Sequence, residues 1–234
     1  MIQGLRDKYN FHVLAPEDGI YHIVDTNSRY ISGYCNGYED SNGSAEYLSL
    51  KVKLEKGKQY YVYLKMSSYY PAYSKYNLKV LLTQDIDDYP SSKSLASEIF
   101  LDANINGKMD YAGDSDWMYF TASDDGIVQI TIPSNLNCSF ENESSSLWSL
   151  TYSSTYLEYP VVKGTKYYIS LYADDRSKTI SYNVKVTLLP MNDDYGNDKN
   201  TAELIEADTL MSGRINYIGD IDCFKFIPEL SGIY

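Results

Sequence analysis

The residues best suited to chemistry in this sequence are aspartates, which gather in two groups with the same spacing. The first group is Asp85, Asp87, Asp88, Asp114 and Asp116, and the second is Asp193, Asp194, Asp220 and Asp222. Hard cations such as Ca²⁺ bind about six to eight oxygens, drawn from several carboxylates and carbonyls. We therefore predict a calcium site in each group, formed where its two acidic stretches meet in space.

A second interpretation of the same aspartates needs no metal. Aspartate in a Gly-Asp-x-Asp segment often accepts hydrogen bonds from nearby backbone N–H groups, and aspartate before a short helix stabilises the helix N-terminus. The spacing also differs from the D-x-D-x-D-G loop of an EF-hand. The sequence leaves both interpretations open.

Tyrosine is the other residue type that stands out, with 26 among 234 residues. Its ring offers a flat apolar surface with a polar tip and loses little conformational entropy on binding, which suits an extended polymer such as a peptide or a glycan. We predict ligand contacts for Tyr61, Tyr63, Tyr168 and Tyr172. The alternative is that tyrosine, a good strand former, only covers a half-exposed sheet.

Residue types that catalyse reactions are scarce. The chain has two histidines, His12 and His22, and neither a G-x-S-x-G nor an H-E-x-x-H motif. Carboxylates are abundant, but their tandem recurrence favours a repeated structural role over a single catalytic pair. Cys35, Cys138 and Cys223 form no C-x-x-C pair, so neither a disulfide framework nor a thiolate zinc site is indicated. We predict no catalytic residues and no enzyme activity.

The aspartates follow an internal repeat of the whole sequence. The stretch that begins at Asp87 matches the stretch that begins at Asp193, 106 residues later, without a gap as far as Phe120 and Phe226. Tyrosine, glycine and aspartate recur in the same order along both stretches. Repetition at a fixed period indicates a tandem array of similar structural units.

A second match fixes the boundaries of the units. EKGKQYYVYL from Glu55 resembles VKGTKYYISL from Val162, again at a spacing of about one repeat. We therefore predict three parts: a first unit that lacks its N-terminal portion, a complete second unit, and the opening portion of a third, at residues 1–83, 84–190 and 191–234.

The local pattern within a unit is that of β-strands. Apolar residues alternate with polar ones in YLSLKVKL, which places on one face Leu48, Leu50, Val52 and Leu54. The alternation turns Tyr61 and Tyr63 outward in the next strand, and Tyr168 and Tyr172 outward in the matching strand of the second unit. A short helix is predicted in SSKSLASEI and in NDKNTAELI, each opening on a capping Ser or Asn. The fold class is thus all-β: tandem jelly-roll-like antiparallel β-sandwiches with one short helix per unit.

The motif DDYGND…TA…GRINYIGDIDCFKF…SGIY resembles the bacterial pre-peptidase C-terminal domain. The resemblance implies jelly-roll-like sandwiches appended to secreted bacterial proteases and surface proteins, where they are removed on maturation or hold the enzyme near its substrate. The collagen-binding modules of clostridial collagenases are a related branch, and some of them bind calcium. The first unit departs from the pattern: Tyr9 stands where the others have Asp116 and Asp222, so no metal site is expected there.

The charge balance restricts the partners. A formal net charge of −12 repels the phosphates of nucleic acids and the headgroups of anionic lipids, and no apolar run is long enough to insert into a membrane. The N-terminus, MIQGLRDKYNF, does not read as an export signal. The resemblance therefore carries the expectation that the protein is extracellular or at the cell surface, with its signal peptide outside this sequence.

We predict from these features a non-catalytic accessory module that binds an extracellular protein or polysaccharide. The alternative is a structural spacer, or adhesin stalk, whose repeats have no specific ligand. Because residues 191–234 carry the opening elements that the first unit lacks, we also expect them to complete that unit in the same chain or in a neighbouring one, as in a domain swap.

Overall fold

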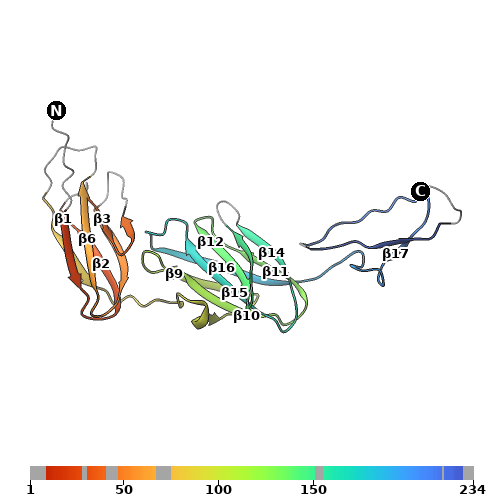
Figure 1. Cartoon of the computed structure of the whole chain (residues 1–234), viewed down its shortest axis with the longest axis horizontal. Helices are drawn as coiled ribbons and strands as arrows, with labels where there is room; N and C mark the ends of the chain where they lie inside the picture. The colour runs from red at the N-terminus through yellow and green to blue at the C-terminus, as the bar shows by residue number, and fades with distance from the viewer. Residues whose placement is uncertain are drawn as a thin grey trace, which may run out of the picture.

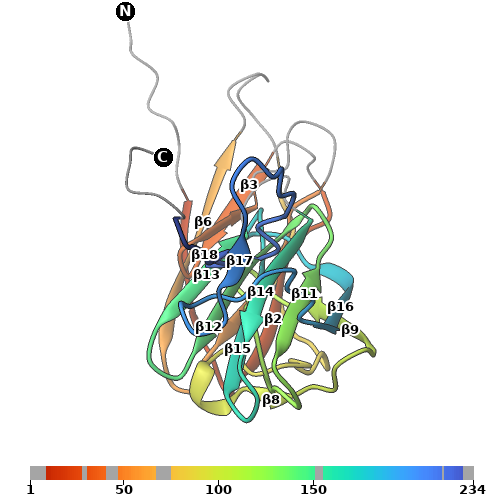
Figure 2. The ribbon, with the colours of Figure 1, turned by 90° about the vertical axis from the view of Figure 1, so that its right-hand side faces the viewer.

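The computed structural model describes residues 9–27, 31–40, 47–66, 75–150, 155–217 and 219–228. Figure 1 shows two groups of strands, red to orange and yellow to cyan, followed by a blue C-terminal segment. We call strands β1–β7 the first unit, the elements from η1 to β16 the second unit, and the residues from Met191 onward the tail. Figure 2 turns this view so that the tail and the second unit lie in front of the first unit.

The first unit consists of two antiparallel sheets. Its strands are β1 (Tyr9–Leu14), β2 (Gly19–Asp25), β3 (Ile31–Cys35), β4 (Tyr38–Asp40), β5 (Ser49–Leu54), β6 (Gln59–Met66) and β7 (Leu78–Leu82). One sheet has the order β1-β6-β3-β4 and the other β5-β2-β7. The chain therefore crosses between the sheets at every connection except the hairpin that joins β3 to β4.

The second unit has the same strand order with one strand added to each sheet. Its elements are η1 (Lys93–Leu95), β8 (Ser97–Glu98), β9 (Asn104–Met109), β10 (Asp116–Thr121), β11 (Gly126–Thr131), β12 (Leu136–Asn142), β13 (Ser146–Leu150), β14 (Tyr156–Val161), β15 (Lys166–Ala173) and β16 (Ile180–Pro190). The sheets are β13-β12-β15-β10-β8 and β14-β11-β16-β9. Strands β10 to β16 thus take the places of β1 to β7, while β8 and β9 have no counterpart among the described residues of the first unit.

Each unit has its own hydrophobic core between its two sheets. In the second unit, Phe120 and Phe140 from one sheet pack in the same cluster as Val128, Ile130 and Val186 from the other. In the first unit the predicted inward face is confirmed, because the exposed fraction is at most 1% for Leu48, Leu50, Val52 and Leu54. The all-β sandwich fold is therefore as predicted from the alternation of apolar residues.

The predicted helices are wrong. Residues 91–99 contain only the single 3-10 turn η1, after which Ser97 and Glu98 form β8 and pair with Met118 and Tyr119. Serine hydroxyls compete for backbone groups in non-helical conformations, and a helix of nine residues is too short to form without tertiary support. Pairing of β8 along the open edge of β10 satisfies the backbone instead.

The tail repeats this edge arrangement in place of its predicted helix. Strand β17 (Glu203–Ile205) pairs in parallel with β18 (Phe224–Phe226), in the register that joins β8 to β10. Among the described residues β17 pairs with no strand of the first unit, so the same-chain completion is not seen. Completion of the first unit in a neighbouring chain stays a prediction. In such a swap β17 would have to leave β18 and pair with β1 of the neighbour, because β18 and β1 are equivalent strands.

The three cysteines are free thiols. Cys35 and Cys138 are buried in the cores of the first and second unit, and Cys223 is partly exposed in the tail. Cys35 and Cys138 thus take the place of small apolar core residues, as expected from the sequence.

Within the described residues, no helix has the length and apolar character needed to span a membrane.

We expect Phe140→Ala to destabilise the second unit by about 3–5 kcal/mol, because the ring is fully buried and stacks on Phe120 and Tyr167. The neighbouring Trp148→Ala should cost about 1 kcal/mol or less, since that ring is 44% exposed. Urea denaturation, monitored by the fluorescence of Trp117, gives the free energy of unfolding of the second unit in both variants. Equal losses in the two variants would contradict the placement of the core.

Candidate metal centre

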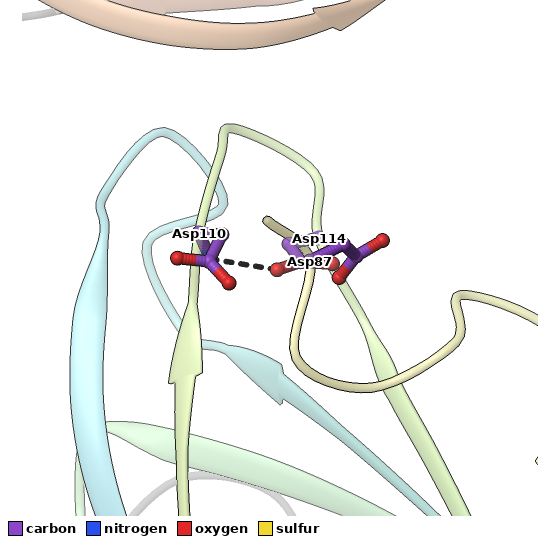
Figure 3. A group of neighbouring side chains, drawn as sticks. All are labelled: Asp87, Asp110 and Asp114. Carbon is purple, nitrogen blue, oxygen red and sulfur yellow. Dashed lines mark hydrogen bonds between the residues drawn. The ribbon is translucent and has the colours of Figure 1, made fainter. Parts of the chain in front are cut away.

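A tight turn between β9 and β10 positions three aspartates of the second unit. Asp110 follows the last residue of β9, Asp114 lies in the turn, and Asp116 begins β10. Gly113 has φ of +85°, a conformation that suits glycine, and Asp114 N–H donates to the carbonyl of Tyr111 at 3.1 Å. The turn therefore folds Asp110 back beside Asp114, as Figure 3 shows.

Asp114 also stabilises the turn itself. One of its carboxylate oxygens accepts the N–H of Asp110 at 2.7 Å, and the other accepts the N–H of Ser115 at 2.8 Å. The turn-stabilising interpretation is thus correct for Asp114. It does not account for the other acidic residues, which lie around the turn without this role.

The segment that joins the two units brings the remaining aspartates to the same place. Ser91 Oγ lies 2.6 Å from the hydroxyl of Tyr111, and Trp117 N–H donates to the carbonyl of Pro90 at 2.9 Å. These contacts hold Asp87 and Asp88 against the turn. Sequence-distant acids therefore meet here.

The acidic cluster, as we call it, comprises five residues, namely Asp87, Asp88, Asp110, Asp114 and Asp116. Carboxylate oxygens of Asp87, Asp110 and Asp114 lie within 4.8 Å of one another, and so do those of Asp87, Asp88 and Asp116. Asp85 is not among these groups; its Oδ2 accepts from Lys51 Nζ at 2.5 Å. Four of the five acids predicted for this site thus come together, with Asp110 added.

Two carboxylate oxygens in the acidic cluster are buried without a partner. Asp116 is 0% exposed, and although its Oδ2 accepts the hydroxyl of Tyr182 at 2.5 Å, its Oδ1 has no hydrogen bond. Asp87 Oδ1 is also buried and accepts no hydrogen bond. A buried acceptor without a donor is costly, so these oxygens are suited to receive a proton or a cation.

The burial of the acidic cluster changes its protonation. Loss of water raises the pKa of Asp116 from 3.8 to about 8 and that of Asp114 to about 6, and the neighbouring carboxylates add to both rises. Burial and Asp110 also raise the pKa of Asp88. Protons or cations must therefore compensate the charge of this site.

The tail contains a similar group of aspartates, with Asn216 at the position of Asp110. Oxygens of Asp193, Asp194 and Asp222 lie within 4.8 Å of one another, and Asp220 accepts the N–H of Asn216 as Asp114 accepts that of Asp110. Oδ1 is buried without a partner in both Asp220 and Asp222. The four aspartates predicted here thus gather around the corresponding turn.

Asp110 is the acidic-cluster residue that the sequence comparison missed. Its counterpart in the tail is Asn216, whose Nδ2 donates to Asp194 at 3.1 Å. A search for acids that recur at one spacing therefore passes over it. Its position next to the Tyr-Ala-Gly-Asp turn was the available signal.

The outward tyrosines of the first unit border an open groove. Tyr63 contacts Tyr34 and Tyr61, with ring centroids 5.8 and 6.4 Å apart, and Tyr61 is 52% exposed. We call these three residues the tyrosine surface. The adjoining groove, of about 460 Å³, is lined by Ser32, Gly33, Tyr34, Glu39, Tyr63, Leu64 and Lys65.

The two predicted tyrosines of the second unit, of which Tyr168 lies at the position of Tyr61, each lie beneath a cation. Lys93 Nζ lies 4.8 Å from the ring centre of Tyr168, and Arg176 lies 4.9 Å from that of Tyr172. Lys93 is also held by Glu141 at 2.9 Å. Of the four predicted binding tyrosines, Tyr61 is exposed and Tyr63 is partly buried at the groove. Tyr168 and Tyr172 are also partly buried, each beneath a cation.

The histidines form no catalytic triad in the described part of the chain. His22 Nε2 lies 2.8 Å from Ser49 Oγ, but no carboxylate among these residues hydrogen-bonds to the imidazole. Burial, followed by the charge of Lys51, lowers the pKa of His22. The pair is a cross-strand contact on the face of a sheet.

Known proteins offer distant structural resemblances. The pre-peptidase C-terminal domain of a Bacillus anthracis collagenase is 17% identical with a TM-score of 0.34, covering 43% of this chain and 99% of that one. A periplasmic inhibitor of g-type lysozyme from Aeromonas hydrophila is 14% identical with a TM-score of 0.32, covering 40% and 95%. The tandem N-terminal CBM22 domains of a Paenibacillus barcinonensis protein are 10% identical with a TM-score of 0.23, covering 77% and 82%.

No protein-family model matches the chain, and no curated protein matches it in sequence. Membership of the pre-peptidase C-terminal family thus stays a prediction, although the first of these solved structures is such a domain. At these identities the resemblances do not indicate what this chain binds.

The metal-free protein should lose stability as the pH rises from about 4 to about 8. The pKa values of Asp114 and Asp116 in the folded state, about 6 and about 8, lie above the ordinary 3.8, so the folded state keeps protons that the unfolded state releases. Asp116→Asn keeps an oxygen for Tyr182 and should flatten the fall between about pH 6 and 8.

Urea denaturation at a series of pH values, with chelator present, tests this expectation. Asp124→Asn is the control, since Asp124 is 72% exposed in the turn that follows β10. If the Asp116→Asn profile runs parallel to that of the unchanged protein, Asp116 does not carry the effect.

Proposed function

We propose that this chain is a non-catalytic accessory module of a secreted protein, which binds an extended extracellular polymer through the tyrosine surface of its first unit. The observation that carries the proposal is the open groove beside Tyr34 and Tyr63. Aromatic rings at the edge of a groove, together with a few polar groups, are the usual features of a ligand site.

The polar groups of the groove suit an uncharged, hydroxyl- or amide-rich chain. Lys65 and Glu39 lie 3.8 Å apart, so the groove offers one donor and one acceptor group of opposite charge. Ser32 adds a hydroxyl near Glu39. A polymer can stack on the rings while its polar groups exchange hydrogen bonds with this pair.

Calcium is proposed as a structural brace of the second unit and the tail. Carboxylates supply the hard oxygen ligands that Ca²⁺ prefers, and the unpartnered oxygens of Asp87 and Asp116 give the ion two buried ligands in the second unit. In the tail, the unpartnered oxygens of Asp220 and Asp222 offer two corresponding ligands. When bound, the ion neutralises the clustered charge and ties the joining segment to the turn.

The spacer alternative differs from this proposal in one respect: a stalk needs the same sandwiches and the same brace, but no ligand for the tyrosine surface. The covered tyrosines of the second unit are compatible with a stalk. The open groove of the first unit favours binding, and a binding measurement distinguishes the two.

We expect Tyr61→Ala/Tyr63→Ala to weaken polymer binding about tenfold or more, as for loss of an aromatic hot spot. Affinity electrophoresis in gels that contain gelatin, xylan or laminarin measures it. Tyr168→Ala is the matched control, because Lys93 already covers that ring. Retardation by none of the three polymers would support the spacer, and equal loss in both variants would contradict the assignment of the tyrosine surface.

We expect millimolar Ca²⁺ to raise the unfolding temperature of the second unit, and a chelator to reverse the rise. Binding to the folded state alone stabilises by about 2.7 kcal/mol at one hundred times the Kd. Tryptophan fluorescence reports this unit, which holds both Trp117 and Trp148. The Asp88→Asn/Asp116→Asn variant leaves Asp114 to hold the turn, so it should fold and lose the calcium response, whereas Asp124→Asn should keep the response. A response that persists in the double variant would contradict the site.

A further inference from the structure

A lysine of the first unit reaches the acidic cluster of the second unit. The alternation of β5 turns Val52 and Leu54 into the first core and leaves Lys53 outside. Lys53 Nζ lies 2.7 Å from Asp87 Oδ2 and 5.1 Å from the ring centre of Tyr111. An ammonium group from one unit thus partly neutralises the carboxylates of the other.

The same turn that carries the acidic cluster also joins the two units. Ala112 N–H donates to the carbonyl of Lys51 at 2.7 Å, and Ala112 is 3% exposed because it packs with the core residues of the first unit. Gly113 lies so close to Tyr38 that a β-carbon at this position would overlap the Tyr38 hydroxyl. In Figure 3 a strand of the first unit passes beside this turn.

Within the described residues, the turn of the tail has no such close contact at its glycine. Asp220 N–H donates to the carbonyl of Tyr217 at 3.2 Å, as in the second unit, yet a β-carbon at Gly219 would meet no atom within 4 Å. Gly219 therefore adopts its positive φ without a neighbour packed against it, so the close contact with Tyr38 is particular to Gly113.

The strand that corresponds to β5 lacks the docking lysines. Gly19 faces Leu54 in the first unit as Gly126 faces Val161 in the second, so Glu158 stands at the position of Lys51 and Pro160 at that of Lys53. Neither residue can supply an ammonium group to the acids of the tail. The two lysines are therefore present on β5 of the first unit and absent from β14, its counterpart in the second unit.

We propose that Lys53 serves as an internal cation for the acidic cluster, so that docking of the first unit and binding of a divalent cation oppose each other. The inference rests on the calcium site proposed above. Asp87 is shared by both cations, and a bound Ca²⁺ and the ammonium group repel each other at close range where water is partly excluded. Coupling between two sites is reciprocal, so calcium must weaken docking by the factor by which docking weakens calcium binding.

The first test is the calcium affinity of Lys53→Met, which keeps the apolar stem and removes the charge. We expect the affinity of the second unit for Ca²⁺ to rise about tenfold, within the usual range of coupling between sites. Lys79→Met, an exposed lysine change on β7, is the control and should bind as the unchanged protein does. Titration calorimetry with Ca²⁺ alone, on chains whose tail site is removed by Asp220→Asn/Asp222→Asn, measures the second unit.

The outcomes separate the two proposals. Equal affinity in Lys53→Met and in the unchanged protein would leave the calcium brace standing and overturn the internal cation. Binding to neither protein would overturn both.

Hydrogen exchange of the Ala112 amide gives an independent readout, since this N–H is protected by the carbonyl of Lys51. We expect saturating Ca²⁺ to speed its exchange in the unchanged protein. Slower exchange on calcium binding would show that the ion and the joint support each other, contrary to the proposal.

Discussion

The buried carboxylates at the turn between β9 and β10 are the constraint around which this structure is organised. Asp110, Asp114 and Asp116 are each at most 3% exposed, and charged groups taken out of water must be neutralised or paired. Each surrounding element supplies part of the compensation: Lys108 pairs with Asp110, Tyr182 donates to Asp116, and Lys53 arrives from the first unit. The unpartnered oxygens mark where that compensation is incomplete.

Much of this arrangement could be read from the sequence because it depends on periodicity. Alternation of apolar residues gave the inward faces of the sheets, and the recurrence of aspartates at one spacing located most of the acidic cluster. Asp110 escaped because asparagine replaces it in the tail, and Lys53 because its contact crosses from one unit to the next. The helix prediction failed for a related reason: residues 97–98 pair with a strand that lies about twenty residues further along the chain.

Equivalent strand positions carry different surfaces in the two units. Tyr61 and Tyr168 both lie on outward faces of paired strands, yet of these two rings, among the described residues, a lysine lies above that of Tyr168 alone, supplied by η1. The described part of the first unit contains no element that corresponds to η1. Sheet geometry therefore decides which way a tyrosine points, while the neighbouring segments decide whether it is available to a ligand.

The free thiols determine how the cores respond to a change of redox environment. Burial raises the pKa of Cys35 to about 11 and that of Cys138 to about 12, and the thiolate is the form that attacks disulfides and oxidants. At neutral pH both sulfurs are almost entirely protonated and enclosed by the sandwich. Neither core therefore contains a disulfide cross-link at these cysteines, and burial makes both thiols slow to react with disulfides or oxidants when the redox environment changes.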